Sequence, residues 1–269
     1  MSFFRTLGLG VLPPTALAAA SVAWKLLLLT SAAGLWTRFS TAGAFVLGTY
    51  LMGIPQSFGK IHHDNGVLVF AMGILAFSRC GDGWSVDSLV RAARRPFDAA
   101  PSPGGEYTWP IRMMWLVMSL VFFGAGVSKL RHSGLEWITS NTLRSILLRS
   151  NDPLAHPADT PLTNWGLWLA GVPWLCMALG AVSLALELFF PLALFSRTAR
   201  RIVVPGVLAV QIGISVFMGP DFLRFLVSYL FWVPWDRLGG ALSRVAARFP
   251  PARVLAEPRT DAEQGTATD

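Results

Sequence analysis

The stretch RMMWLVMSLVFFGAGVSK at positions 112–129 has no charged residue between its two ends. A helix needs about 20 mostly apolar residues to cross the hydrocarbon core of a bilayer, within a range of about 17–25. A surface helix of a soluble protein would instead show a polar face. The segment therefore favours a membrane-spanning helix.

The composition of the whole chain agrees with this segment. Hydrophobic residues make up 53% of the 269 residues and charged residues only 14%, whereas a soluble domain carries about 25% charged residues. Such a composition excludes a disordered chain. The net charge of +7 is spread between apolar runs, so we expect no nucleic-acid partner. We predict an all-α fold, a polytopic transmembrane helical bundle surrounded by membrane lipid.

Other apolar runs bring the predicted number of spans to about seven. They cover residues 15–36, 38–55, 65–79, 174–195, 202–218 and 220–236. We assign residues 1–236 to one transmembrane helical domain. The amphipathic pattern of 237–249 predicts a cytoplasmic helix on the membrane surface, and the Pro-rich, then polar segment 250–269 predicts a disordered tail.

Two shorter segments are predicted to lie at the membrane surface. In residues 84–97, apolar residues oppose arginines on a helix that Ser85 or Asp87 could cap. A solvated charged loop is the alternative for this segment. Residues 163–172 are too short to cross alone, and we expect Trp165 and Trp168 at the level of the lipid headgroups.

The distribution of basic residues predicts the orientation. With seven spans, RAARR (91–95) and SRTARR (196–201) fall on the same side, which receives more than twice as many Lys and Arg residues as the other. Basic residues concentrate in cytoplasmic loops. We therefore expect a multi-pass protein of the cell membrane, with its N-terminus outside and its C-terminus in the cytoplasm.

Polar residues gather where three predicted spans meet the outer side. Lys129 ends one of these spans, and Asp64 lies at another. We predict that the remaining members bind substrate; they are His62, His63, Asn65, Asp221 and Arg224. The histidines and Asp64 supply few ligands for a metal, so we expect no metal site.

Lys129 has two interpretations. A lysine at the end of a span often extends its amine to the headgroups. Alternatively, a lysine partly withdrawn from water holds its proton less firmly, because desolvation penalises the charged form. Such an amine can act as a base near neutral pH.

Two further ionisable residues fall within predicted spans, Lys25 in the first and Glu187 in the fifth. Polar residues at membrane depth cost several kcal/mol unless they are paired. We expect Lys25 and Glu187 to be structural polar residues that could pair across the bundle.

Two motifs resemble the vitamin K-dependent gamma-carboxylase, within the wider carboxylase-like, horizontally transferred transmembrane (HTTM) family. The run AGVSKL (125–130), followed by Trp137, resembles that enzyme's A-G-V-K-K-L run and its following tryptophan. GILAF (73–77), followed by WSVD (84–87), resembles its G-L-L-A-F followed by W-S-V-D. The resemblance covers residues from about 60 to 236.

The resemblance implies that Lys129 is the base that deprotonates a reduced quinone such as vitamin K hydroquinone. The chain would then be a quinol-linked carboxylase or oxidoreductase with a lipid-soluble quinone as its partner. Two features differ. The family's histidine at the start of the third span aligns with Leu68, and His63 and Asn65 lie about one turn earlier. The large lumenal domain of the carboxylase has no counterpart here.

The sequence leaves three functional classes open. The first is the quinol-linked enzyme. The second is a non-catalytic lipid-binding or transport protein with the same fold, which the unmatched histidine favours. The third is a structural subunit of a membrane complex. No protein partner can be named from the sequence.

Overall fold

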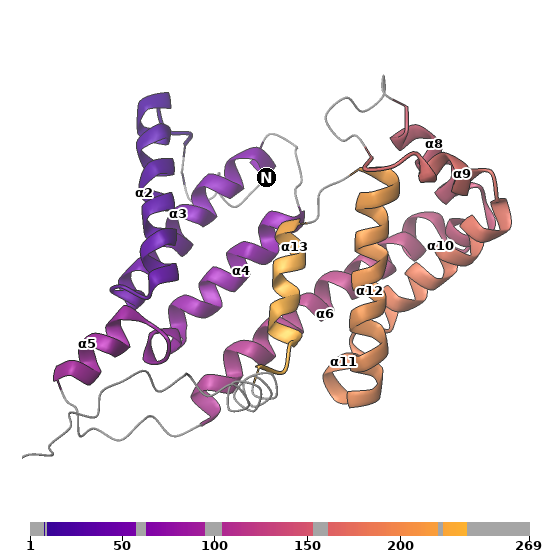
Figure 1. Ribbon diagram of the computed structural model, residues 1–269. Coiled ribbons are helices and arrows are strands. Elements are labelled where there is room, and N and C mark those ends of the chain that lie inside the picture. The colour runs from indigo at the N-terminus through magenta and orange to yellow at the C-terminus, as the bar shows by residue number, and fades with distance from the viewer. Residues whose placement is uncertain are drawn as a thin grey trace, which may run out of the picture. The chain divides into compact units, whose positions relative to one another are not determined.

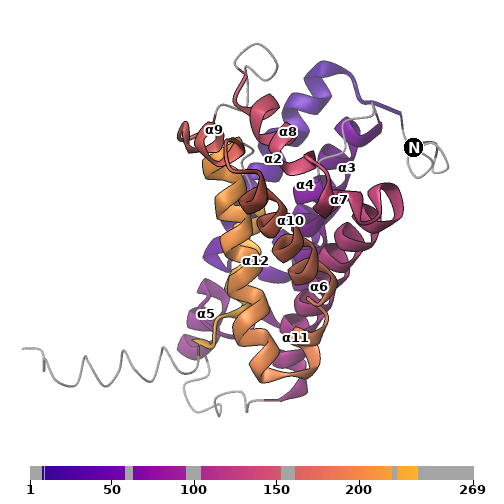
Figure 2. The ribbon, with the colours of Figure 1, turned by 90° about the vertical axis from the view of Figure 1, so that its right-hand side faces the viewer.

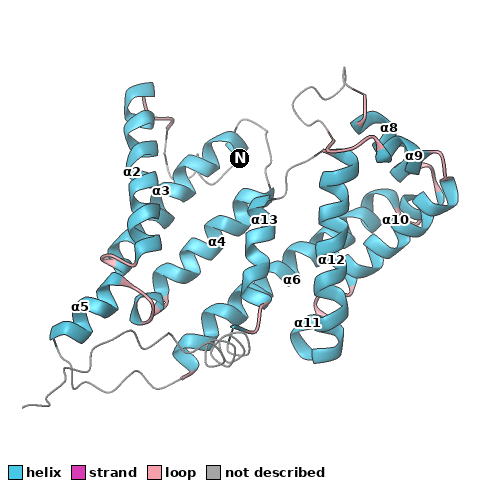
Figure 3. Ribbon diagram, viewed as in Figure 1, coloured by secondary structure: helices cyan, strands magenta, loops and turns pink. Residues whose placement is uncertain are grey.

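The structure is a computed structural model that describes residues 8, 10–57, 63–94, 104–152, 161–219 and 223–235. Every regular element in these residues is a helix, as Figure 3 shows. The predicted all-α class is therefore confirmed. The predicted surface helix at 237–249 and the tail at 250–269 lie outside the described residues.

Each predicted span coincides with helical structure (Figure 1). The long helices are α2 (Pro14–Ala33), α3 (Thr37–Ser57), α4 (His63–Phe77), α6 (Gly105–Ser133), α10 (Pro173–Leu188) and α12 (Arg197–Met218). The short elements are η1 (Cys80–Asp82), α5 (Val86–Arg94), α7 (Glu136–Thr139), α8 (Thr142–Ser150), α9 (Trp165–Ala170), α11 (Leu192–Phe195), α13 (Leu223–Val227) and η2 (Ser228–Trp232). The segment predicted at 220–236 is thus a short α-helix followed by a 3-10 helix.

Three helices in the described residues are long and apolar enough to cross a membrane, namely α2, α6 and α12. Asn65–Phe77 and Pro173–Leu188 are apolar but shorter. The predicted segment 174–195 is divided, because α10 ends at Leu188 and α11 begins only at Leu192. The structure therefore has three candidate spans, and the count of about seven is not confirmed.

The main hydrophobic core lies where α4, α6, α12, α13 and η2 meet. Met114 and Met118 of α6 are fully buried there. Phe122, one turn further along α6, stacks at 4.6 Å from Phe190 and at 5.1 Å from Phe225, measured between ring centroids. Close aromatic packing of this kind adds to the energy of area burial. Both ribbon views place α10 beside α12, in contact with α6 (Figure 2).

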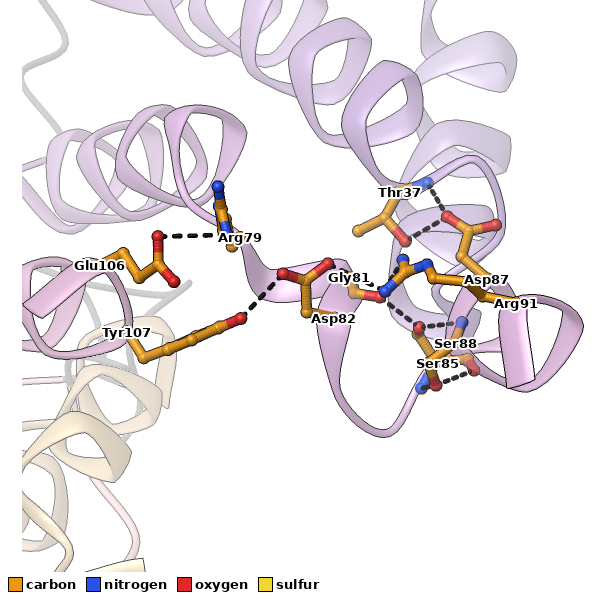
Figure 4. A network of polar contacts seen from close by, with 10 residues as sticks. All are labelled: Thr37, Arg79, Gly81, Asp82, Ser85, Asp87, Ser88, Arg91, Glu106 and Tyr107. Carbon is orange, nitrogen blue, oxygen red and sulfur yellow. Dashed lines mark hydrogen bonds and ion pairs between the residues drawn. The ribbon is translucent and has the colours of Figure 1, made fainter. Parts of the chain in front are cut away.

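The chain between α4 and α6 ties three helix ends together (Figure 4). Ser85 Oγ accepts from the Ser88 amide and Ser88 Oγ accepts from the Ser85 amide, so this reciprocal pair caps α5. Asp87 instead caps the neighbouring helix α3, because its carboxylate accepts from the amides of Trp36 and Thr37. Of the two predicted caps, Ser85 therefore serves its own helix and Asp87 serves another.

The same network holds the start of α6. Tyr107 donates a hydrogen bond of 2.9 Å to Asp82, and Arg79 forms an ion pair with Glu106 at 3.1 Å (Figure 4). Exposed ion pairs contribute little stability. Their main effect here is to fix the connection between the segment that contains WSVD and the helix that contains Lys129.

Replacing Asp87 with Asn tests the cap on α3. Hydrogen bonds from the amide and hydroxyl of Thr37 hold the pKa of Asp87 below its ordinary value. A depressed pKa in the folded state contributes stability above the unfolded pKa of about 4, and that contribution is lost as the pH falls through the folded pKa. We expect Asp87→Asn to lower the Tm at neutral pH. The difference from wild type should shrink below about pH 4. Thermal unfolding in detergent from neutral pH to below pH 4 measures the difference in Tm between the variant and wild type. A difference that does not change with pH would contradict the role of the Asp87 charge.

Candidate functional site

Lys129 points into the protein and pairs with Glu187. Its Nζ lies 2.5 Å from Glu187 Oε1 and 4.8 Å from the centre of the Trp137 ring. The Lys129 side chain is 23% exposed and the Glu187 side chain 11%. Lys129 thus does not extend freely to the surface. The expected pairing of Glu187 with Lys25 is wrong, because Glu187 is bound to Lys129, and Lys25 is exposed on α2.

A glycine of the AGVSKL run explains why these two residues meet. A Cβ atom added at Gly126 would lie 3.0 Å from the Leu188 side chain and 3.2 Å from the Leu188 backbone nitrogen. A side chain at position 126 would press against Leu188, so the glycine favours the close approach of α6 and α10. Lys129 follows Gly126 by one helical turn, and Glu187 precedes Leu188. The close contact of the two helices thus brings the amine and the carboxylate together.

The surroundings of the pair are poor in other hydrogen-bonding groups. Ser183 donates a long bond of 3.5 Å to Glu187 Oε1. Within the described residues, the buried atoms Glu187 Oε2 and Trp137 Nε1 have no hydrogen-bond partner. An unsatisfied buried polar atom costs stability and often marks a functional site.

A cavity of about 510 Å³ adjoins the pair. Among the residues that the structure describes, Lys129 is the one ionisable lining residue, and the side chains of Trp137 and Ser183 carry one polar atom each. The apolar lining consists of Leu143, Ile146, Leu147, Leu169, Leu179, Gly180, Val182, Leu186, Gly206, Ala209, Val210, Gly213, Ile214, Phe217 and Met218. Ligand sites are typically about 300–1,000 Å³, mostly apolar, with a few polar groups that orient the ligand.

The cavity opens toward the outer surface of α10 and α12. Leu179 and Val182 line it and are also 39% and 50% exposed. Ala209 of α12 lines it and is likewise exposed. The rim of the opening is therefore apolar. A bilayer around α12, a candidate span, would bring lipid to this opening.

Residues of α8 and α9 also line the cavity, and both elements are tied to α12. Asn151 Nδ2 donates to the carbonyl of Phe217 at 2.9 Å, and the Thr163 hydroxyl donates to that of Val216 at 3.2 Å. These bonds satisfy carbonyls at the C-terminal end of α12. Gly166 permits the contact, since an added Cβ would lie 2.3 Å from the Phe217 carbonyl oxygen. Trp165 and Trp168 of α9 are exposed, and their placement at the level of the headgroups stays a prediction.

The other predicted site residues are not seen at the cavity. His62 and Asp221 lie outside the described residues. His63 begins α4 and Arg224 lies in α13, but their side chains are outside the described part of the structure. Asn65 is buried in the first turn of α4 and does not line the cavity. The predicted grouping of these residues around Lys129 stays a prediction.

The small residues that make room for the cavity were not predicted from the sequence. Gly206, Ala209 and Gly213 recur along one face of α12 and line it. Their spacing was a usable signal, although small residues in a span more often indicate helix–helix contact. Within the described residues, no group of three His, Cys, Asp or Glu side chains could hold a metal ion.

Comparisons of the chain with protein-family models, with curated proteins and with solved structures find no match.

Proposed function

We propose that this chain is a multi-pass membrane protein that binds a lipid-soluble, quinol-class molecule in the cavity beside Lys129. The observation that carries the proposal is the apolar cavity with one ionisable residue in its wall. An isoprenoid or alkyl chain matches the apolar lining, and a phenolic ring matches the position of Lys129 and Trp137. A reduced quinone such as vitamin K hydroquinone would supply an acidic hydroxyl and, after oxidation, the driving force for carboxylation or electron transfer.

Lys129 serves as the base in this proposal, with Glu187 as its proton partner. In this proposal a proton passes from the Lys129 amine to Glu187 across the 2.5 Å contact. The neutral amine then takes the proton of a bound hydroxyl. The resulting ammonium lies beside the new oxyanion and stabilises it.

The proposed placement in the membrane is that of a bundle of about seven spans, with the N-terminus outside. The contacts of the polar network support part of it, since Thr37 begins α3, Arg79 follows the end of α4, and Asp87 and Glu106 lie in the first turns of α5 and α6. Arg200 lies near the start of α12 and is held by the carbonyl of Ala193. We propose that both regions face the cytoplasm, with Lys129 nearer the outer leaflet.

A non-catalytic lipid-binding protein is the second candidate. The ion pair favours it, because a lysine that remains an ammonium bound to a carboxylate is a structural clamp and not a base. The cavity would then hold a lipid without changing it. Likeness to the HTTM family would in that case concern the fold alone.

Replacing Lys129 with Arg separates the two candidates. Arginine keeps the positive charge opposite Glu187 but cannot give up a proton in a protein. We expect Lys129→Arg to fold like wild type. Its turnover should be lower by about 10²–10⁴-fold, which is the rate enhancement that a general base supplies. The assay follows oxidation of menaquinol by oxygen in nanodiscs, measured by absorbance.

Lys25→Arg is the matched control, because Lys25 is exposed on α2. It should oxidise menaquinol at the wild-type rate. Wild-type protein that does not accelerate the reaction, or a fully active Lys129→Arg variant, would contradict the proposal and leave the lipid-binding alternative.

A further inference from the structure

The Lys129–Glu187 pair gives the polar end of the cavity no net charge. Lys129 lines the cavity, while Glu187 lies behind it and is not part of the wall. No other ionisable residue of the described chain lines the cavity. A ligand that enters therefore meets an amine whose charge is already balanced at 2.5 Å.

This balance distinguishes between ligand headgroups. A fixed anion would add an uncompensated negative charge to an apolar cavity and would be repelled by the Glu187 carboxylate. Both effects are strong where the effective dielectric constant is low. An uncharged hydroxyl adds no charge. It can hydrogen-bond to the amine, which lines the cavity.

We propose that Glu187 restricts the cavity to amphiphiles with an uncharged, hydrogen-bonding head, such as phenols and quinols, and excludes amphiphiles whose head is a fixed anion. This inference rests on the proposed function and makes Glu187 its specificity-determining residue. Fatty-acid anions and phospholipids, although abundant in a membrane, would not compete for the site. The carboxylate acts through Lys129 and does not itself contact the ligand.

The test compares two probes that share a tail and differ in the head, 4-nonylphenol and 4-nonylbenzenesulfonate. Detergent-solubilised protein is mixed with equal amounts of both, and native mass spectrometry counts each bound molecule. The ratio of bound sulfonate to bound phenol is the readout. Partition into micelles differs between the two probes but is the same in every sample, so it cancels when the ratio is compared between variants.

We expect wild type to bind the phenol in preference to the sulfonate. Glu187→Gln leaves Lys129 as an unbalanced cation, and the ratio should shift toward the sulfonate by about tenfold or more. Glu187→Asp keeps the charge and should keep the wild-type ratio. Glu106→Gln, which removes an exposed carboxylate outside the cavity wall, should also leave it unchanged.

The outcomes distinguish this inference from the function it rests on. If Glu187→Gln binds the phenol and its ratio of sulfonate to phenol is unchanged, the inferred role of Glu187 is overturned, but the proposed function is not. Binding of neither probe by wild type would contradict the proposed function as well. Should Glu187→Gln fail to fold, wild type still decides, because equal binding of sulfonate and phenol, after correction for the measured partition of each probe into protein-free micelles, overturns the inference.

Discussion

Lys129→Met should destabilise the protein by about 3–5 kcal/mol, the usual cost of removing one partner from a buried ion pair. The loss arises because the variant leaves the Glu187 carboxylate buried with only a 3.5 Å bond from Ser183. The hydrophobic stem of methionine cannot compensate for a charge left without a partner. Thermal or denaturant unfolding in detergent, followed by near-UV circular dichroism, measures the change.

The double variant Lys129→Met, Glu187→Met separates charge from packing. Replacing a whole buried pair by apolar residues of similar size is often neutral or stabilising. We therefore expect the double variant to recover most of the lost stability while still lacking quinol turnover. Lys25→Met, on the exposed face of α2, should unfold like wild type. A Lys129→Met single variant as stable as wild type would show that the Glu187 carboxylate does not depend on the Lys129 amine.

The positions of the helices were predictable because apolar runs and their breaks are local properties of the sequence. The run at 112–129 lies within α6, and 202–218 lies within α12. The run at 174–195 was predicted as one span, and within it Phe189, Phe190 and Pro191 separate α10 from α11. Hydropathy alone does not detect this break, since the intervening residues are themselves apolar.

The partner of Glu187 was not predictable in the same way. A pattern along one helix says which face is buried, but not which other helix covers that face. Because α10 packs on α6 whereas α2 packs on α3, Glu187 meets Lys129 and not Lys25. The carboxylate of Asp87 shows the same limit, since its position in the sequence suggested a cap for α5 and its place in the fold makes it the cap of α3.

The orientation of Lys129 was one of two interpretations open from the sequence. What decides it is Gly126, which lets α10 come close enough to place the Glu187 carboxylate beside the amine. Without that partner, extension toward the headgroups would be the lower-energy position for the amine. The AGVSKL run is thus more informative than Lys129 itself, because it fixes both the contact between α6 and α10 and the direction of the Lys129 side chain.

Gly213→Phe should close the cavity and lower ligand affinity by about 100-fold or more, which corresponds to about 2.7 kcal/mol. Gly213 lines the cavity, and a Cβ added there would meet only the Phe217 side chain, at an ordinary 3.8 Å. The new ring can therefore extend into the cavity without a clash at its base. Glycine is also a poor helix former, so the substitution should not weaken α12.

Gly124→Phe is the matched control for this substitution. Gly124 lies on α6, and an added Cβ there would have no atom within 4 Å. The control introduces the same side chain into a helix but leaves the cavity open. Saturation binding of 4-nonylphenol, counted by native mass spectrometry, should therefore fall in Gly213→Phe and remain at the wild-type level in Gly124→Phe. If Gly213→Phe binds the phenol as tightly as wild type while folding normally, the ligand does not occupy this cavity, and Lys129 must act, if it acts at all, on a molecule bound elsewhere.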